Sequence, residues 1–330
     1  MVELARRLPL PQRRLPASPV VLFLAAACIF LVVGCLQSSI FAQQTVAGVA
    51  TGVVYGSLAL ALVLIYRATE VINFAQGEMA MACVYIAYQL IQWGFSYWEA
   101  FFVTLPIALV LGMAIQVALI RPVQHRSVIA VVIITVGLFI LIDGLVAWKW
   151  GADIKFMPSP FGNRIYHVGS VAIARQDIGT IVITLFMVVL LWALFRFTKL
   201  GLGMRAAALR PAAASLAGVR VDWMLAIGWG LAAVLGAVAG LMTEPSQFLQ
   251  PTMMQSILLY AFAAAVLGGL ESPAGSVVGG LAIGVFLNLI GQYWGFATAE
   301  LRLPIAFVVL LVVLLFKPTG LFGRKQVRRV

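Results

Sequence analysis

Residues 71–93 read VINFAQGEMAMACVYIAYQLIQW, a stretch that is long and apolar enough to cross a bilayer but opens with Asn73, Gln76, Gly77 and Glu78. Polar and ionisable side chains are costly inside a membrane, so they mark a pathway, a partner or a bend. Counted along a helix from the start of the stretch, Glu78 is expected roughly 10 Å deep. The segment predicts a helix break that lines a pathway; the alternative is a structural carboxylate hydrogen-bonded to a neighbouring helix.

The composition identifies the class of protein. Of 330 residues, 63% are hydrophobic and only 10% are charged, and the mean hydropathy is +1.07. Soluble domains carry roughly a quarter of charged residues. We therefore predict an all-α fold, a polytopic transmembrane helical bundle.

A hydrocarbon core needs roughly 20 apolar residues per helix. Ten apolar segments are found, at 19–37, 45–66, 71–93, 98–120, 128–148, 177–197, 222–242, 256–270, 275–294 and 302–317. The eighth and tenth are short, so the alternative to ten crossings is eight crossings and two partial segments.

Basic residues orient the bundle through the positive-inside rule. With the N-terminus in the cytoplasm, seventeen of the 22 basic residues fall on the inside. We expect a basic cytoplasmic N-terminus (1–18), a transmembrane domain (19–317) with an internal segment at 198–222, and a basic cytoplasmic tail (318–330). Both termini are then cytoplasmic. The residues before Cys35 resemble a lipoprotein cleavage site, but the charge balance favours a retained first span.

A second interruption of similar composition lies near the C-terminus. Residues 268–275 read GGLESPAG and place Glu271 and Ser272 between two apolar segments. Paired interruptions in the two halves of a membrane protein point to a transport pathway. Asn288, in the ninth segment, is a further polar candidate for the same interior. The predicted pathway residues are therefore Asn73, Gln76, Gly77, Glu78, Glu271, Ser272 and Asn288.

The internal segment 198–222 is rich in alanine, leucine and arginine, which are strong helix formers. Pro211 suits the first turn of a second short helix, and Gly218 suits its end. A helix with such small side chains can lie in the groove of another protein; the alternative is a basic helix resting on lipid headgroups.

Several functions are excluded by what the sequence lacks. It contains no GxxxxGK[ST] phosphate loop and no arrangement typical of a hydrolase, so we expect a non-enzyme without a bound cofactor. The cysteines and histidines form no ligand pattern, so no metal site is expected. The basic residues stand in short segments between apolar runs, which does not favour nucleic-acid binding.

Four separated motifs together resemble the branched-chain amino acid ABC transporter permeases, inner-membrane subunits of high-affinity leucine, isoleucine and valine uptake systems. The resemblance covers roughly residues 45–323. Its motifs are YGSLA through VINFAQGE (55–78), GMRA with the alanine-rich stretch (203–218), GGLESPAG (268–275) and KPTGLFG (317–323).

The resemblance implies an ABC importer permease fold of a bacterial inner-membrane protein. It also implies the partners: two cytoplasmic ATPases that use ATP, a second homologous permease, a periplasmic solute-binding protein and the membrane lipid. The internal segment would be the coupling helix seated on the ATPase, with Arg205, Arg210, Ala213 and Gly218. Where the family motif begins Glu-Ala-Ala, this chain has alanine at 212, so no salt bridge is implied there.

The substrate and the energy source leave alternatives open. Leucine, isoleucine and valine are the leading prediction, and similar permeases are associated with urea and short amides. A proton-coupled secondary transporter would use Glu78 as its ionisable site. A non-transporting membrane assembly factor is a further class. The coupling-like segment favours the ATP-driven importer over the last two.

Overall fold

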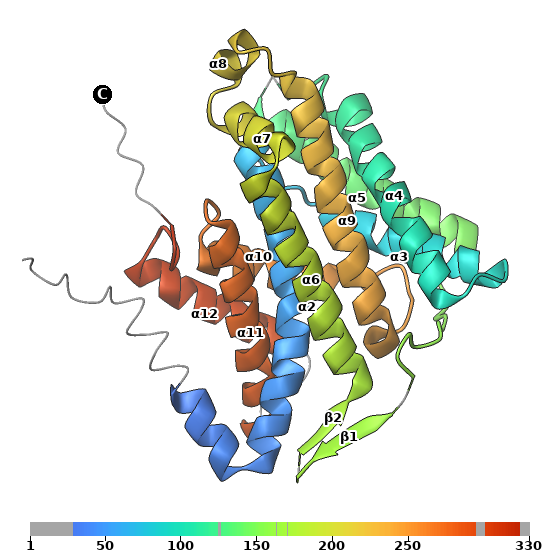
Figure 1. Ribbon diagram of the computed structural model, residues 1–330, viewed down its shortest axis with the longest axis vertical. Coiled ribbons are helices and arrows are strands. Elements are labelled where there is room, and N and C mark those ends of the chain that lie inside the picture. Colours follow the sequence, from blue (N-terminus) through green and yellow to red (C-terminus); the bar gives the residue numbers. More distant parts are fainter. Residues whose placement is uncertain (1–28, 125–126, 163, 170, 295–300, 324–330) are drawn as a thin grey trace, which may run out of the picture.

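The structure is a computed structural model that describes residues 29–124, 127–162, 164–169, 171–294 and 301–323. Within these residues it is a bundle of helices with one small β-hairpin (Figure 1). The helices are α2 (Ser39–Thr69), α3 (Gln76–Gln92), α4 (Tyr97–Ile115), α5 (Val128–Trp150), α6 (Arg175–Phe197), α7 (Lys199–Leu209), α8 (Pro211–Leu216), α9 (Val221–Gln247), α10 (Gln255–Gly268), α11 (Pro273–Tyr293) and α12 (Arg302–Phe316). A π-helix, Gln116–Ile120, continues α4.

Helices α2 and α9 form the centre of the bundle. In the most apolar part of each of these helices, 78% of the residues are buried, against 17% in the corresponding part of α5. Helices α6, α9, α10 and α11 pack on α2, while α3 and α4 pack on α9. Helix α5 is apolar on all sides and turns most of its side chains outward, as a helix that faces lipid does.

Small residues allow the closest helix contact, which joins α2 to α11. Gly48, Gly52 and Gly56 recur every four residues on α2 and face Gly280 and Gly284. A Cβ atom on Gly280 would lie 2.2 Å from the Gly56 nitrogen, so no larger side chain fits. Glycine at this spacing lets two backbones approach in a membrane, where packing drives helix association.

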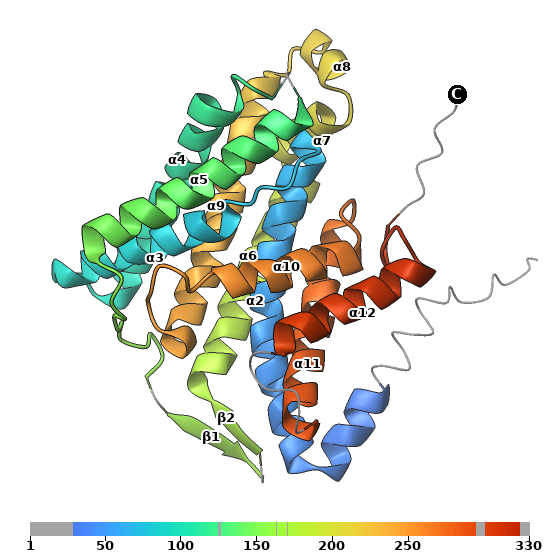
Figure 2. The same ribbon diagram turned by 180° about the vertical axis from the view of Figure 1, so that it is seen from behind.

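Each of the ten predicted segments contains a helix in the described part of the chain. Six helices are long and apolar enough to cross a membrane: α2, α4 with its π-helix, α5, α6, α9 and α11. Helices α10 and α12 are shorter, as predicted, and run at a steep angle to α2 (Figure 2). Of the first segment, residues 29–37 are helical. Its remainder and the basic N-terminus lie outside the described residues.

The two ends of the bundle differ in structure. Helices α7 and α8 lie at one end, and a hairpin of β1 (Ile165–Val168) and β2 (Val171–Ala174) lies at the other (Figure 1). Apart from this hairpin, the regular elements of the described residues are helices, which confirms the predicted helical bundle. The strands pair in register, from Ile165 opposite Ala174 to Val168 opposite Val171. Gly169, with φ 63°, supplies the backbone conformation that the tight turn requires.

Candidate translocation site

The polar start of the 71–93 stretch forms a turn and the first residues of α3. The Asn73 side chain accepts a hydrogen bond from the Ala75 N–H at 3.0 Å and donates one to Gln76 Oε1 at 3.3 Å. The Asn73 side chain thus occupies the N-terminal turn that precedes α3, which begins at Gln76. Helix α3 therefore begins five residues after the start of the 71–93 stretch, because the Asn73 side chain bonds the nearby backbone of Ala75 in a turn.

Gln76 and Gly77 attach this turn to two other helices. The Gln76 amide donates to the Ala232 carbonyl oxygen of α9 at 2.9 Å. A Cβ atom on Gly77 would lie 3.2 Å from the Leu258 side chain, so the start of α3 packs closely on α10. Both residues were predicted to line the pathway, and the structure uses both to hold α3 in place.

Glu78 is the acid enclosed by this arrangement. It is fully buried in the first turn of α3, near the Gln255 amide of α10 and the Asp143 carboxyl group of α5. Neither of its carboxylate oxygens has a hydrogen bond of ordinary geometry among the described residues, and Gln255 of α10 is a polar side chain that interacts with it. The structure therefore agrees with both expectations for Glu78, a pathway residue and a structural carboxylate beside a neighbouring helix. A buried acid with so few polar contacts is rare and often marks a functional site.

The second interruption is a surface turn between α10 and α11. Glu271 is exposed, and the Ser272 hydroxyl accepts a hydrogen bond from the Gly275 N–H at 3.1 Å, which caps α11. Glu78 lies beside the first turn of α10 and Glu271 follows its last, so about 20 Å of helix separates them. The two interruptions therefore lie at opposite ends of the 14-residue helix α10 and do not contact each other through it.

The motif at residues 317–323 docks on this second turn. The Leu321 and Phe322 N–H groups donate to the Leu267 and Gly268 carbonyl oxygens at 2.8 and 3.0 Å. These are carbonyls of the last turn of α10, which have no partner within the helix. Of the segment predicted as a basic cytoplasmic tail, residues 318–323 therefore lie against the bundle, and residues 324–330 lie outside the described ones.

Asn288 is hydrogen-bonded to a residue that lines a small polar pocket, which the sequence did not reveal. Its amide donates to the Thr51 hydroxyl of α2 at 2.9 Å. Thr51 lines a cavity of about 50 Å³ between α2, α6, α9 and α10, close to the hairpin end of the bundle. Its other polar lining residues are Tyr55, Asp177, Thr180, Thr243, Ser246 and Gln247. Four helices contribute residues to this pocket. A single Ser or Thr hydroxyl is typical of a membrane helix, so none of these residues indicated a pocket in the sequence.

The predicted coupling segment folds as two short helices, as expected. Pro211 begins α8, and Gly218 follows its end with φ 81°. Arg210 and Ala213 are exposed on it. Arg205, by contrast, is partly buried and donates from Nε to the Gly201 carbonyl oxygen at 3.3 Å.

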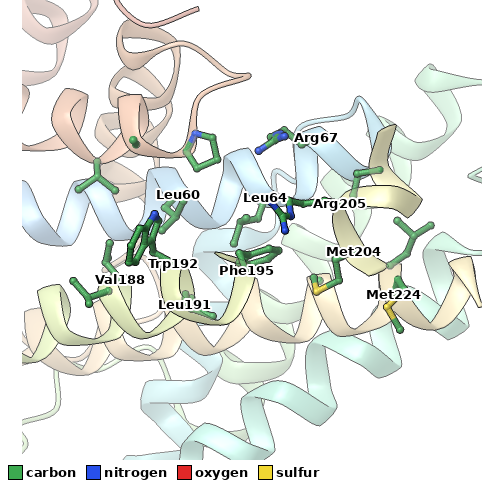
Figure 3. Close-up of a pocket in the computed structure, with 18 residues that line it drawn as sticks. Leu60, Leu64, Arg67, Val188, Leu191, Trp192, Phe195, Met204, Arg205 and Met224 are labelled. Carbon is green, nitrogen blue, oxygen red and sulfur yellow. The ribbon is translucent and has the colours of Figure 1, made fainter. Parts of the chain in front are cut away.

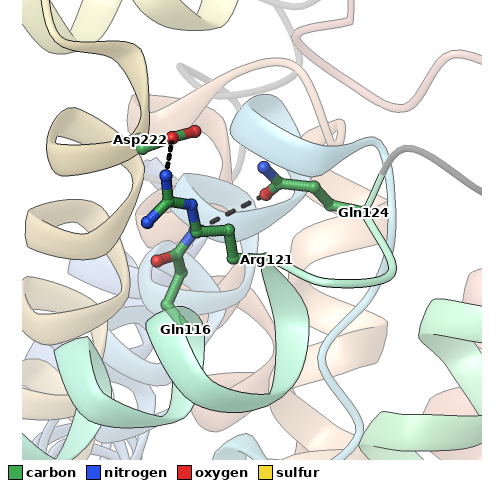
Figure 4. A network of polar contacts seen from close by, with 4 residues as sticks. All are labelled: Gln116, Arg121, Gln124 and Asp222. Atoms are coloured by element: carbon green, nitrogen blue, oxygen red, sulfur yellow. Dashed lines mark hydrogen bonds and ion pairs between the residues drawn. The ribbon is translucent and has the colours of Figure 1, made fainter.

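A polar network ties the start of α9 to the end of α4. Arg121, which follows the π-helix, forms an ion pair with Asp222 in the first turn of α9 (Figure 4). The Gln116 amide donates to Gln124 Oε1 at 3.5 Å in the same network. π-Helical turns occur frequently at functional sites because they place an extra residue in the helix.

Helix α9 connects all three parts of the site. Asp222 lies in its first turn, and Ala232 at its middle accepts the hydrogen bond from Gln76. Near its far end, Met242, Thr243, Ser246 and Gln247 line the polar pocket. Its 27 residues span about 40 Å. A displacement of α9 at the end with α7 and α8 would therefore move both the start of α3 and one wall of the pocket.

This arrangement, a polytopic helical bundle with a short helix pair at one end and polar groups inside, defines a membrane transport subunit. The model of the family described as branched-chain amino acid transport system / permease component matches residues 44–314. The chain belongs to this family. It is a transport component and not a catalytic one, and it is a multi-pass inner-membrane protein.

Individual relatives agree with this membership. The high-affinity branched-chain amino acid transport system permease protein LivH of Escherichia coli K12 is 30% identical over 307 residues, which cover 88% of this chain and 98% of that protein. BraD of Pseudomonas aeruginosa, with the same description, is 28% identical over 88% of this chain and 98% of its own length. A solved structure, PsaBC from Streptococcus pneumoniae in complex with Fab, has 14% identity and a TM-score of 0.46, covering 88% of this chain and 97% of that one.

Proposed function

We propose that the chain is the substrate-translocating permease subunit of an ATP-driven importer of leucine, isoleucine and valine. It works by alternating access in the bacterial cytoplasmic membrane, with both termini in the cytoplasm. The descriptions of its relatives name branched-chain amino acids as the substrate class. Family membership across residues 44–314 is the observation on which the proposal rests. The apolar bundle suits a branched aliphatic side chain, and the polar pocket at the hairpin end suits a zwitterion.

The proposed partners follow from the two ends of the bundle. Two cytoplasmic ATPases would bind α7 and α8, a second homologous permease would complete the membrane unit, and a periplasmic solute-binding protein would approach the hairpin end. The basic residues Arg67, Arg121, Lys199 and Arg210 gather at the α8 end, which supports its cytoplasmic placement. ATPase movement at α8 would reach the polar pocket through α9.

The test is reconstitution of the chain with candidate ATPases, second permease and binding protein. We expect ATP-dependent uptake of labelled leucine that exceeds uptake of labelled urea. Preferential urea uptake would contradict the proposed substrate class and still support an ATP-driven importer. Leucine uptake that persists after removal of the ATPases, and that follows an imposed proton gradient, would favour the secondary transporter instead.

A variant of α8 tests the proposed coupling contact. Ala213 is exposed, so Ala213→Trp should leave the permease folded and prevent ATPase binding by steric conflict. Ala152→Trp, at an exposed position near the hairpin end, is the matched control. Normal co-purification of the ATPase with Ala213→Trp would place the coupling contact elsewhere.

A further inference from the structure

A second, larger cavity lies at the α8 end of the bundle. It has a volume of about 360 Å³ and is lined by α2, α6, α7, α9 and α11 (Figure 3). This volume falls within the range of small-molecule sites, about 300–1,000 Å³. It shares no lining residue with the polar pocket or with the start of α3.

The cavity is polar at one end and apolar at the other. Figure 3 shows the Arg67 and Arg205 side chains toward one end, and Leu60, Val188 and Trp192 toward the other. Leu60 precedes Arg67 by seven residues on α2, which is about 10 Å along the helix. The basic end is the one next to α7. This polarity matches an amphiphile that enters with its headgroup at the membrane surface.

The positive charge of the cavity is not compensated. Its lining contains two arginines and no acidic residue. The Arg67 side chain forms no hydrogen bond or ion pair with another described residue. Arg205 donates only from Nε, to Gly201, which leaves its terminal guanidinium nitrogens available. Two guanidinium groups without an acid recognise a phosphate.

We propose that this cavity binds an anionic phospholipid, with the headgroup phosphate at Arg67 and Arg205 and one acyl chain along Leu60, Val188 and Trp192. Basic pockets between transmembrane helices on the cytoplasmic side favour anionic headgroups. A zwitterionic amino acid fits less well, because its ammonium group would meet two arginines and no carboxylate. The assignment to the cytoplasmic leaflet rests on the orientation given under the proposed function.

The experiment uses the whole transporter complex in vesicles that contain phosphatidylglycerol with a photoactivatable acyl chain. We expect labelling of peptides from α2 and α6, and little labelling by the matching phosphatidylethanolamine probe. Arg67→Gln with Arg205→Gln should lower labelling at least about fivefold, since each basic side chain near an anionic lipid contributes to binding. Replacement of both residues by lysine should preserve labelling.

Two further variants separate the lipid site from general effects. Arg196→Gln removes an exposed charge from the same end outside the cavity and should label normally. Gly228→Leu keeps both arginines but should reduce labelling by filling the cavity, because a Cβ atom there has only Met204 Cε nearby, at 3.4 Å.

Three results would overturn the proposal. Equal labelling by both lipids would mean that the phosphate charge is not recognised. Competition by glycerol phosphate would indicate a simple anion site, and competition by leucine would place the cavity on the substrate path. The labelling needs no transport, so a complex that fails to import leucine but labels normally would contradict only the proposed function.

Discussion

The two polar interruptions, residues 73–78 and 268–275, have similar compositions and different roles. Each contains glycine, a hydrogen-bonding side chain and one glutamate. In the first, Glu78 is fully buried and the turn is bonded to α9; in the second, Glu271 is exposed and the turn is covered by residues 317–323. Composition alone therefore does not distinguish a buried polar turn from a surface turn; burial of the acid and the helix to which the turn is bonded do.

Lysine at each of the two glutamate positions should separate the interruptions most strongly. We expect Glu78→Lys to lower the yield of assembled complex by about tenfold or more, because burial of an ammonium group costs several kcal/mol even beside the Asp143 carboxyl group. Glu271→Lys should assemble normally, since water solvates the new ammonium group. Size-exclusion chromatography of both variants measures the difference, and equal yields would contradict the distinction.

Packing at the glycines should rank in the opposite order. A Cβ atom on Gly268 would lie 2.1 Å from the Gly275 carbonyl oxygen. A Cβ atom on Gly77 would be less crowded, with the Leu258 side chain at 3.2 Å and the Met254 carbonyl oxygen at 3.3 Å. We expect Gly268→Ala to lower the melting temperature of the purified permease clearly more than Gly77→Ala does. Overpacking of this kind typically costs about 1–3 kcal/mol. A greater loss for Gly77→Ala would show that the start of α3 is the tighter contact.

Loss of one or two hydrogen bonds should have the smallest effects. Ser272→Ala removes the cap of α11 and is expected to cost about 1 kcal/mol. Gln76→Leu removes the bond to α9 and the one from Asn73, and is expected to cost about 2 kcal/mol. The two variants should therefore melt within a few degrees of each other. Their transport should differ, because only Gln76 attaches the start of α3 to the helix that reaches the polar pocket. Equal leucine uptake by both would remove Gln76 from the coupling between α9 and α3.

Local signals in the sequence predicted much of the fold. Pro211 and Gly218 bound α8 because one fixes the backbone for a first turn and the other adopts positive φ. The ten apolar segments all contain helices in the described residues, since hydrophobicity determines which segments enter a bilayer. Hydropathy alone does not locate the start of α3, because it does not detect the hydrogen bond from the Ala75 N–H to the Asn73 side chain.

The site itself was less accessible from the sequence. Glu78 was recognisable because an acid in an apolar stretch is conspicuous. The polar pocket was not, because Thr51, Thr180 and Thr243 stand on three helices and are brought together only by packing. The separation of Glu78 from Glu271 could not be predicted for the same reason, since the direction and length of α10 determine it.

The most direct test compares Glu78→Gln with Glu271→Gln in ATP-dependent leucine uptake by reconstituted complexes. Both substitutions replace a carboxyl group with an amide of nearly the same size. The account predicts that Glu78→Gln assembles normally and transports at least about tenfold more slowly, a barrier increase of about 1.4 kcal/mol, while Glu271→Gln transports normally. Normal uptake by an assembled Glu78→Gln complex would contradict the claim that the buried start of α3 is part of the transport mechanism.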